Sequence, residues 1–278
     1  MIKKNDPPGA VLSIAGSDPS GGAGIQADLK TFCVAGVYGG AVITCHTVQN
    51  TRGVNSFQPV DPVLVREQIR MVLADLPVSH IKIGMIGSTG IAAALHDELK
   101  DFPGEIIYDP VLVSSGGTPL MAGLDAPFLK KQVAGLATVM TPNLPELEFL
   151  SNRKCGSPGD IFQAAAGLFP ALARLRTVIV TGGHFAENEN VVVDTMLTRG
   201  GVTGEVITRQ EEHRRHRTRN THGTGCTFSS AFTAFHLMAG EDYQAFRQAV
   251  AFMDRLLEKS CDFQMGSGNG PLPHHLLK

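Results

Sequence analysis

The sequence predicts an α/β fold in which a mostly parallel central sheet carries helices on both faces. Short apolar runs with the length of buried strands alternate with longer segments whose apolar residues recur at helical spacing. Loops rich in turn formers separate them, and glycine accounts for 31 of the 278 residues. The hydrophobic content of 43% is that of a folded globular chain. Such alternation is typical of parallel strands connected by helices.

The predicted strands are the short apolar runs. The first, at 10–15, ends at Gly16 and leads into a loop crowded with glycine and proline. A helical pattern follows this loop at 25–35, so the chain begins as strand, glycine loop and helix. Further strands are predicted at 41–46, 80–83, 105–108, 137–140 and 177–180.

The predicted helices fill the intervals between these strands. Asp61-Pro62 has the composition of a helix start, and Val65 and Ile69 follow it at helical spacing. Further helices are predicted near 88–100, 123–134, 143–151, 159–174, 226–239 and 242–259.

The alternation changes after Gly183. Runs at 191–198 and 202–209 flank Arg199-Gly200-Gly201, which predicts a hairpin and hence an antiparallel edge to the sheet. No linker, repeat or low-complexity tract divides the chain. We therefore predict one domain over residues 1–278, with 1–9 as a flexible N-terminal tail.

Composition excludes several classes of partner. The net charge of −2 gives no general reason to expect nucleic acid or a membrane surface. The five cysteines form no CxxC pair, and their odd number argues against a disulfide framework or a zinc ribbon. No apolar run approaches the roughly 20 residues of a membrane span, and the N-terminus lacks the apolar core of a signal peptide. We expect a cytoplasmic protein.

Polar residues follow the predicted strands at the ends where such sheets bind ligands. The residues in question are Gln49, Lys82, Asp109, Asn143, Thr181 and His184, together with the loop 16–24 and the turn 223–226. The loop also contains Gly22-x-Gly24-x-x-Ala27, a weak dinucleotide-binding fingerprint, but the next strand ends without the carboxylate that would hold a ribose. The chain has no GxxxxGK[ST] phosphate loop.

The stretch 220–232 combines a glycine-containing turn, the thiol of Cys226 and the start of a predicted helix. Backbone N–H groups at such a turn can bind an anion, and a thiol at a helix start ionises more easily than usual. The alternative is a glycine turn that opens a buried helix in which Cys226 only packs. Spacing alone does not decide between them.

Several motifs together resemble those of one enzyme family, the hydroxymethylpyrimidine/phosphomethylpyrimidine kinases of the ribokinase-like superfamily. The resemblance runs in order from about residue 10 to 270. It is carried by the segment 15–31 (AGSDPSGGAGIQADLKT), Gln49-Asn50-Thr51, Lys82-Ile83-Gly84-Met85, Asp109-Pro110-Val111, Thr141-Pro142-Asn143-Leu144, Gly182-Gly183-His184 and the segment 221–227 (THGTGCT).

This resemblance implies a ribokinase-like three-layer α/β/α sandwich and a homodimer. It also implies the phosphorylation of 4-amino-5-hydroxymethyl-2-methylpyrimidine, and then of its monophosphate, in thiamine biosynthesis. ATP and Mg²⁺ would be the cofactors, and phosphoryl transfer needs donors for the moving charge and a group that takes the hydroxyl proton.

The resemblance also implies roles for individual residues. Cys226 would accept the hydroxyl proton, where the wider superfamily has an aspartate, and Gly223, Thr224 and Gly225 would donate to the phosphoryl group. The pyrimidine would be bound by Gln49, Ala23, Asp28, Gly16 and Met85. ATP and its phosphates would be bound by Asn143, Thr181, Gly183 and Asp109, with Glu146 and Asp109 at the metal, partly through water.

Structural alternatives exist for most of these roles. Asn143 and Glu146 could form an ordinary helix start, and Asp109 could be a capping aspartate. Gln49 could be a solvated loop amide, Asp28 a surface acid and Met85 plain core. The histidines His46, His184 and His222 lie on different loops without ligand spacing, so capping or packing is expected of them.

The sequence departs from the family at Thr181, where a lysine that reaches the ATP phosphates is often found. The cationic run 213–219, and Arg217 and Arg219 in particular, could compensate, or could be a solvated strand face. The loop 45–48 also differs from the family's alanine-rich version. A pyridoxal or pyridoxine kinase is therefore the second candidate, and a catalytically silent pyrimidine- or nucleotide-binding protein the third.

Overall fold

The computed structural model describes residues 9–113, 117, 120, 125–184, 190–200 and 205–277. Residues 1–8, most of the predicted tail, lie outside this range. The strands are β1 Ala10–Ser17, β2 Gly39–Asn50, β3 Gly53–Pro59, β4 Val78–Ile83, β5 Glu105–Tyr108, β6 Val139–Met140, β7 Thr177–Val180, β8 Val191–Arg199 and β9 Val206–Arg214.

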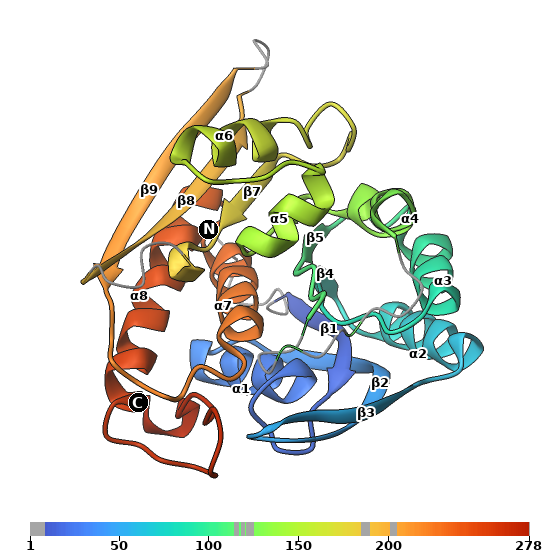
Figure 1. Cartoon of the computed structure of the whole chain (residues 1–278). Coiled ribbons are helices and arrows are strands. Elements are labelled where there is room, and N and C mark those ends of the chain that lie inside the picture. The colour runs from blue at the N-terminus through green and yellow to red at the C-terminus, as the bar shows by residue number, and fades with distance from the viewer. Residues whose placement is uncertain are drawn as a thin grey trace.

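These strands form one sheet in the order β3-β2-β1-β4-β5-β6-β7-β8-β9 (Figure 1). The six strands from β2 to β7 in this order are parallel neighbours. β3 and β8 join the two ends of this parallel block antiparallel, and β9 pairs antiparallel with β8. The carboxyl end of β9 therefore lies at the same edge of the sheet as those of the parallel strands.

Helices cover both faces of the sheet. They are α1 Gly24–Ala35, α2 Pro62–Asp75, α3 Thr89–Leu99, α4 Ala126–Gln132, α5 Leu144–Ser151, α6 Pro158–Ala166, α7 Thr224–Ala239 and α8 Asp242–Ser260, with single 3₁₀ turns at Ala134–Leu136, Gly182–His184 and His274–Leu276. The helices α2 to α6 lie on one face, and α1, α7 and α8 on the other (Figure 1).

Strand alternation explains these two layers. On β5, Ile106 and Tyr108 pack in the core beneath α2 to α6, whereas Ile107, between them, packs against α7 and α8. Buried strands of a parallel block need apolar residues on both faces, which is why they read as continuous apolar runs. The predicted three-layer α/β fold with an antiparallel edge is confirmed.

Three elements differ from the prediction. A second antiparallel edge strand, β3, was not predicted, because its polar residues give it little apolar patterning. The second strand of the predicted hairpin is β9, which runs to Arg214 because all nine residues of β8 find partners on it. The predicted helix 159–174 ends at Ala166, since Gly167 and Pro170 follow. Residues 121–124 and 201–204, where two predicted elements begin, lie outside the described residues.

Candidate active site

The glycine loop after β1 and the turn before α7 are packed directly against each other at the carboxyl edge of the sheet. Gly223 has a φ of +80°, and a Cβ there would lie 1.9 Å from the Gly22 carbonyl oxygen. Gly24 has a φ of +56°, and a Cβ there would lie 2.2 Å from the Gly16 carbonyl oxygen. Both positions therefore require glycine. The approach brings together two segments about 200 residues apart in the chain.

Asp18 holds this loop in shape. Its carboxylate accepts hydrogen bonds from the amides of Ser20, Gly22 and Ala23 at 2.8 to 3.0 Å. His222 Nε2 lies 2.7 Å from Asp18 Oδ2 and joins the loop to the turn before α7. Burial alone would raise the pKa of Asp18, but the hydrogen bonds from His222 and Ser20 lower it to about 2. Asp18 is therefore a permanent anion.

Gln49 lies beside the contact between Asp18 and His222, at the carboxyl end of β2. Its amide nitrogen is 3.1 Å from His222 Nε2, and its carbonyl oxygen accepts from Thr47 Oγ1 at 3.1 Å. The side chain is half-buried, so one flank of the amide remains available. The expectation that His222 packs agrees with its burial, and its contacts orient Gln49.

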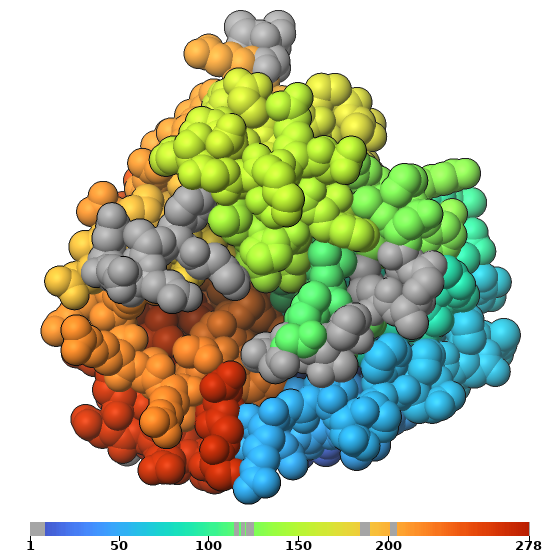
Figure 2. Space-filling view, in the orientation of Figure 1, coloured from blue at the N-terminus to red at the C-terminus, as the bar shows by residue number. Residues whose placement is uncertain are grey.

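Helix α7 begins without a side-chain cap. Six of the eight α-helices in the described residues have one, and the exceptions are α1 and α7, the two that follow glycine loops. Gly225 is exposed, and a Cβ on it would meet nothing within 4 Å. The start of α7 around Gly225 therefore faces an open space, as an anion site requires. Figure 2 shows a hollow in the middle of the face of the molecule turned to the viewer, bounded in part by the orange C-terminal third of the chain.

Cys226 is half-buried as a residue, and burial desolvates its thiol. The Gly24 amide lies close enough to the thiol to favour its ionised form, across the contact between α1 and α7. Burial raises the pKa of the thiol to about 12, although the charge of Lys82 and the Gly24 amide act in the opposite direction. The prediction that the helix start makes this thiol easier to ionise is therefore wrong for this arrangement, because desolvation outweighs the helix dipole.

Asp28 is fully buried, with no exposed surface. Both of its carboxylate oxygens lie 3.1 Å from Lys82 Nζ, and the hydroxyls of Ser13 and Ser230 donate to them at 2.6 and 2.7 Å. This geometry contradicts the prediction that Asp28 contacts the substrate, and equally the alternative of a surface acid. Asp28 can therefore affect the candidate site only through the residues that it contacts.

Asp109 lies at the end of β5, with Tyr108 before it and Thr141 at the end of β6. Each of these residues has a buried side-chain oxygen without a hydrogen-bond partner among the described residues: Asp109 Oδ2, the Tyr108 hydroxyl and Thr141 Oγ1. Lys82 Nζ is 3.6 Å from Asp109 Oδ2, within ion-pair but beyond hydrogen-bond distance. Burial raises the pKa of Asp109. Unpartnered buried oxygens are costly unless a ligand, ion or water meets them, so these residues fit a hydrated metal.

Asn143 and Glu146 form a reciprocal capping box at the start of α5. Asn143 N–H donates to Glu146 Oε2 at 2.8 Å, and Glu146 N–H donates to Asn143 Oδ1 at 3.0 Å. The ordinary helix start considered from sequence is thus present. Burial and the nearby Asp109 raise the pKa of Glu146, which places the two carboxyl groups close enough to interact.

The remaining predicted residues lie around the same edge. A Cβ on Gly16 would be 3.0 Å from Met85 Sδ, so these two residues are in contact, and Met85 is buried. Thr181 is half-buried and its N–H donates to the Pro142 carbonyl at 3.4 Å, while Gly183 is exposed. Nothing is described of the His184 side chain.

Sequence reasoning gave no specific contact to Asp18 or Lys82, and it expected only capping or packing of His222. Asp18 had a readable signal, since Asp-Pro-Ser after a strand favours a turn in which the aspartate accepts from the backbone. His222 and Lys82 had none, because their partners Asp18 and Asp28 are distant in the chain.

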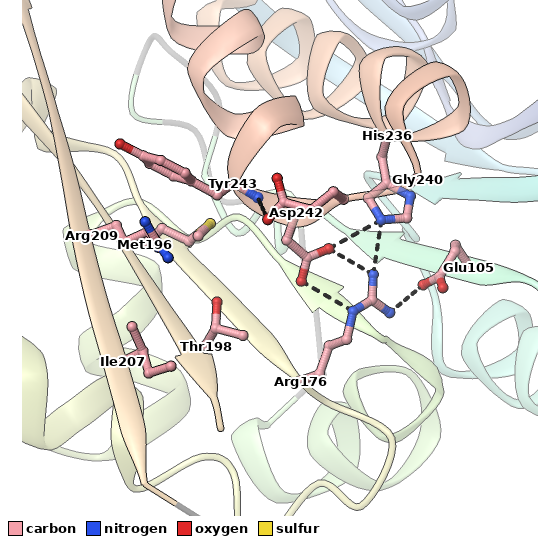
Figure 3. Close-up of a pocket in the computed structure, with 11 residues that line it drawn as sticks. Glu105, Arg176, Met196, Thr198, Ile207, Arg209, His236, Gly240, Asp242 and Tyr243 are labelled. Carbon is pink, nitrogen blue, oxygen red and sulfur yellow. Dashed lines mark hydrogen bonds and ion pairs between the residues drawn. The ribbon is translucent and has the colours of Figure 1, made fainter. Parts of the chain in front are cut away.

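A second cavity, of about 540 Å³, lies at the opposite edge of the sheet, between β8, β9 and the start of α8 (Figure 3). Arg176 there pairs with Glu105 and Asp242, and His236 also contacts Asp242. None of the described buried atoms that lack a partner belongs to its lining. Its polar groups satisfy one another, unlike those of the carboxyl edge.

Comparisons with known proteins point to one family of kinases. A family model described as phosphomethylpyrimidine kinase matches residues 18–273. The hydroxymethylpyrimidine/phosphomethylpyrimidine kinase of Haemophilus influenzae is 39% identical over 266 residues, which cover 95% of this chain and 96% of the relative.

Two solved structures show the same architecture. An ADP complex of pyridoxal kinase from Bacillus subtilis superimposes with a TM-score of 0.82 at 32% identity, covering 97% of this chain and 98% of that one. Phosphomethylpyrimidine kinase from Clostridium difficile 630 superimposes with a TM-score of 0.75 at 31% identity, covering 89% and 98%.

None of the helices in the described residues is both long and apolar enough to span a membrane.

Because a family model spans most of the chain and a named kinase matches it over nearly the full length of both, the protein belongs to the phosphomethylpyrimidine kinase family and is a phosphotransferase with a ribokinase-like fold.

Proposed function

We propose that the protein transfers the γ-phosphoryl group of ATP to 4-amino-5-hydroxymethyl-2-methylpyrimidine and then to its monophosphate. The observation that carries this proposal is the place of Gln49, whose side-chain amide lies against the His222 ring that Asp18 holds, beside the uncapped start of α7. A carboxamide offers a donor and an acceptor, as the edge of an aminopyrimidine requires. The adjacent N–H groups suit a phosphoryl group. Both reactants are thereby held at one edge of the sheet.

Substrate binding is assigned to the loop after β1 and the end of β2. Gln49 would pair with the pyrimidine edge, Ala23 and Gly16 would leave room for the ring, and Met85 would form the apolar floor under Gly16. The small residues matter here because a side chain on Gly16 would crowd Met85, whose Sδ would lie 3.0 Å from the added Cβ.

ATP is assigned to the neighbouring loops, with Asn143, Thr181 and Gly183 near the phosphates. Mg²⁺ would be held by Asp109 and, through water, by Glu146, and it would screen the phosphate charge. Among the described residues no three His, Cys, Asp or Glu side chains cluster closely enough to hold a metal alone. The metal would therefore share its coordination with phosphate oxygens and water.

The first turn of α7 is assigned to the transferred group. The N–H groups of Gly223, Thr224 and Gly225 would donate to it while its charge shifts. Cys226 would take the hydroxyl proton, and Lys82 and the Gly24 amide are the groups that favour its thiolate form. The raised pKa of the thiol makes this a base that works better as the pH rises.

The test is ATP consumption with Mg²⁺ against hydroxymethylpyrimidine, its monophosphate and pyridoxal in parallel. We expect turnover with both pyrimidines and a kcat/KM for pyridoxal at least about tenfold lower. The pyridoxal arm addresses the alternative that the similar pyridoxal kinase structures raise. Tight binding of a pyrimidine without turnover would instead support a silent binding protein.

We also propose that the protein is a cytoplasmic homodimer. Leu64 and Met71 lie seven residues apart, on one face of α2, and their exposed fractions are 46% and 73%. The five free cysteines suit a reducing compartment. Light scattering after size exclusion should give twice the chain mass for the wild type and the mass of a single chain for Met71→Glu. A monomeric wild-type protein would contradict the assignment.

A further inference from the structure

Lys82 is a fully buried lysine in the middle of the sheet. On β4 it lies in register between Ser13 of β1 and Ile107 of β5, on the face that α1 and α7 cover. The reaction proposed above uses its charge to favour the Cys226 thiolate and gives it no contact with either reactant. A buried ion pair is a weak source of stability, and an apolar residue often replaces one without loss. The position of this lysine therefore suggests a different role.

Lys82 and Asp28 together link five elements, β4, α1, β5, β1 and α7. Lys82 Nζ lies 3.1 Å from both oxygens of Asp28 on α1 and 3.6 Å from Asp109 Oδ2 at the end of β5. Asp28 also accepts from Ser13 on β1 and from Ser230 on α7. Both helices that start at the candidate site are thus tied to the sheet beneath it.

Asp28 and Ser230 lie one helical turn after the residues at the starts of α1 and α7 that belong to the candidate site. Asp28 comes four residues after Gly24, and Ser230 four residues after Cys226, so each pair shares a helix face. The Asp28–Ser230 hydrogen bond therefore joins α1 and α7 directly below the contact of the Gly24 amide with the Cys226 sulfur. The separation of the two helix starts depends on this bond.

We propose that Lys82 is a positioning residue for phosphoryl transfer. With Asp28 it holds the first turns of α1 and α7 at the separation that brings the substrate hydroxyl and the phosphoryl group together, and it holds Asp109 beside them. The inference rests on the proposed function, which assigns these turns to the two reactants. Lys82 touches neither reactant. A misplacement of about 1 Å can cost ~10²-fold in rate, so kcat is the sensitive quantity.

The most selective test is Ser230→Ala, which removes the hydrogen bond to Asp28 and leaves both charges paired. Its matched control is Ser229→Ala, because the neighbouring Ser229 Oγ is buried and has no hydrogen-bond partner among the described residues. We expect Ser230→Ala to lower kcat about tenfold, with both KM values changed less than about threefold, and Lys82→Met to lower kcat about a hundredfold. Ser229→Ala should keep wild-type kcat.

A second measurement needs no turnover. Amide hydrogen exchange of the peptide that spans the first two turns of α7 should become at least about tenfold faster in Lys82→Met and Ser230→Ala, while the α8 peptide stays protected. Wild-type kcat in folded Ser230→Ala overturns the inference, whether or not Lys82→Met folds. If the wild-type protein turns over none of the pyrimidines, the proposed function fails, and unchanged exchange in both variants would separately overturn the positioning role.

Discussion

At the scale of single residues, Cys226 shows local and tertiary effects acting in opposite directions. Its place in the first turn of α7 favours a thiolate, but the packing of α1 over the sulfur removes hydration and raises the thiol pKa. A residue type and its position in a helix were therefore not enough to predict its ionisation.

The raised pKa leads to a prediction about pH. If Cys226 is the proton acceptor, only the small ionised fraction is active below the thiol pKa, so kcat should rise about tenfold per pH unit between roughly pH 7 and 9. Cys226→Ala should lower kcat about a hundredfold or more and flatten this slope. Steady-state kinetics across this range checks both effects. A variant with wild-type turnover would remove Cys226 from the mechanism.

Gln49 supports a prediction about substrate binding. Gln49→Ala should raise the KM for hydroxymethylpyrimidine about tenfold and leave the KM for ATP unchanged, because it removes hydrogen bonds to one reactant only. His46→Ala, at an exposed position of the same strand, is the control and should match the wild type. Equal effects of the two substitutions would contradict the assignment of Gln49.

At the scale of elements, the two uncapped helices α1 and α7 define the site. The other six α-helices in the described residues begin with a polar side chain that satisfies part of the first turn, as local rules of helix capping predict. The exceptions are α1, whose first residue Gly24 lies too close to the Gly16 carbonyl for a side chain, and α7, whose N-cap Gly223 lies too close to the Gly22 carbonyl of the other loop. The missing side-chain cap of α7 is therefore the consequence of a tertiary contact.

Gly223→Ala tests this contact. The added Cβ would meet the Gly22 carbonyl, so the helix start must shift, and kcat should fall at least about tenfold. Gly36→Ala is the matched control, since Gly36 has the same φ of +80° but nothing within 4 Å of its Cβ position. It should cost about 1 kcal/mol of unfolding free energy and leave kcat unchanged. Equal kinetics of the two variants would show that the contact is unimportant.

At the scale of the whole molecule, the sheet separates two kinds of polar cluster. The carboxyl edge holds buried oxygens without partners, whereas the opposite edge holds paired charges around Arg176 (Figure 3). The second cluster extends inward to His80, whose Nε2 lies 2.9 Å from His236 Nδ1. The two edges therefore differ in whether their buried polar groups satisfy one another.

Buried histidines predict a pH dependence of stability. Burial lowers the pKa of His80 and of His274 from 6.5 to about 4. Between these values the unfolded chain binds protons that the folded chain does not, so unfolding free energy should be full above about pH 6.5 and fall as the pH drops towards 4, by up to a few kcal/mol. Urea unfolding at several pH values measures this slope. His80→Gln should reduce the slope, and an unchanged slope would exclude His80 as a source.

The sequence determined the parts of this protein that depend on local physics. Apolar runs predicted the strands of the parallel block, helical spacing predicted the helices, and glycine turns predicted where the chain reverses, because these signals need only neighbouring residues. The polar residues at the strand ends likewise predicted a ligand site at the carboxyl edge, which stays a prediction. The edge strands β3 and β9 were missed or displaced, since exposed strands carry little apolar patterning.

Only the tertiary structure decided how the candidate site is assembled. It buried Asp28 against Lys82, joined His222 to Asp18 across 204 residues, and shielded the thiol of Cys226. Desolvation and long-range pairing set these properties, and both depend on which segments pack together rather than on the order of residues within a segment. The sequence thus determined which chemical groups lie at the carboxyl edge of the sheet. Packing decided which of these groups are open to a ligand and which are buried behind them.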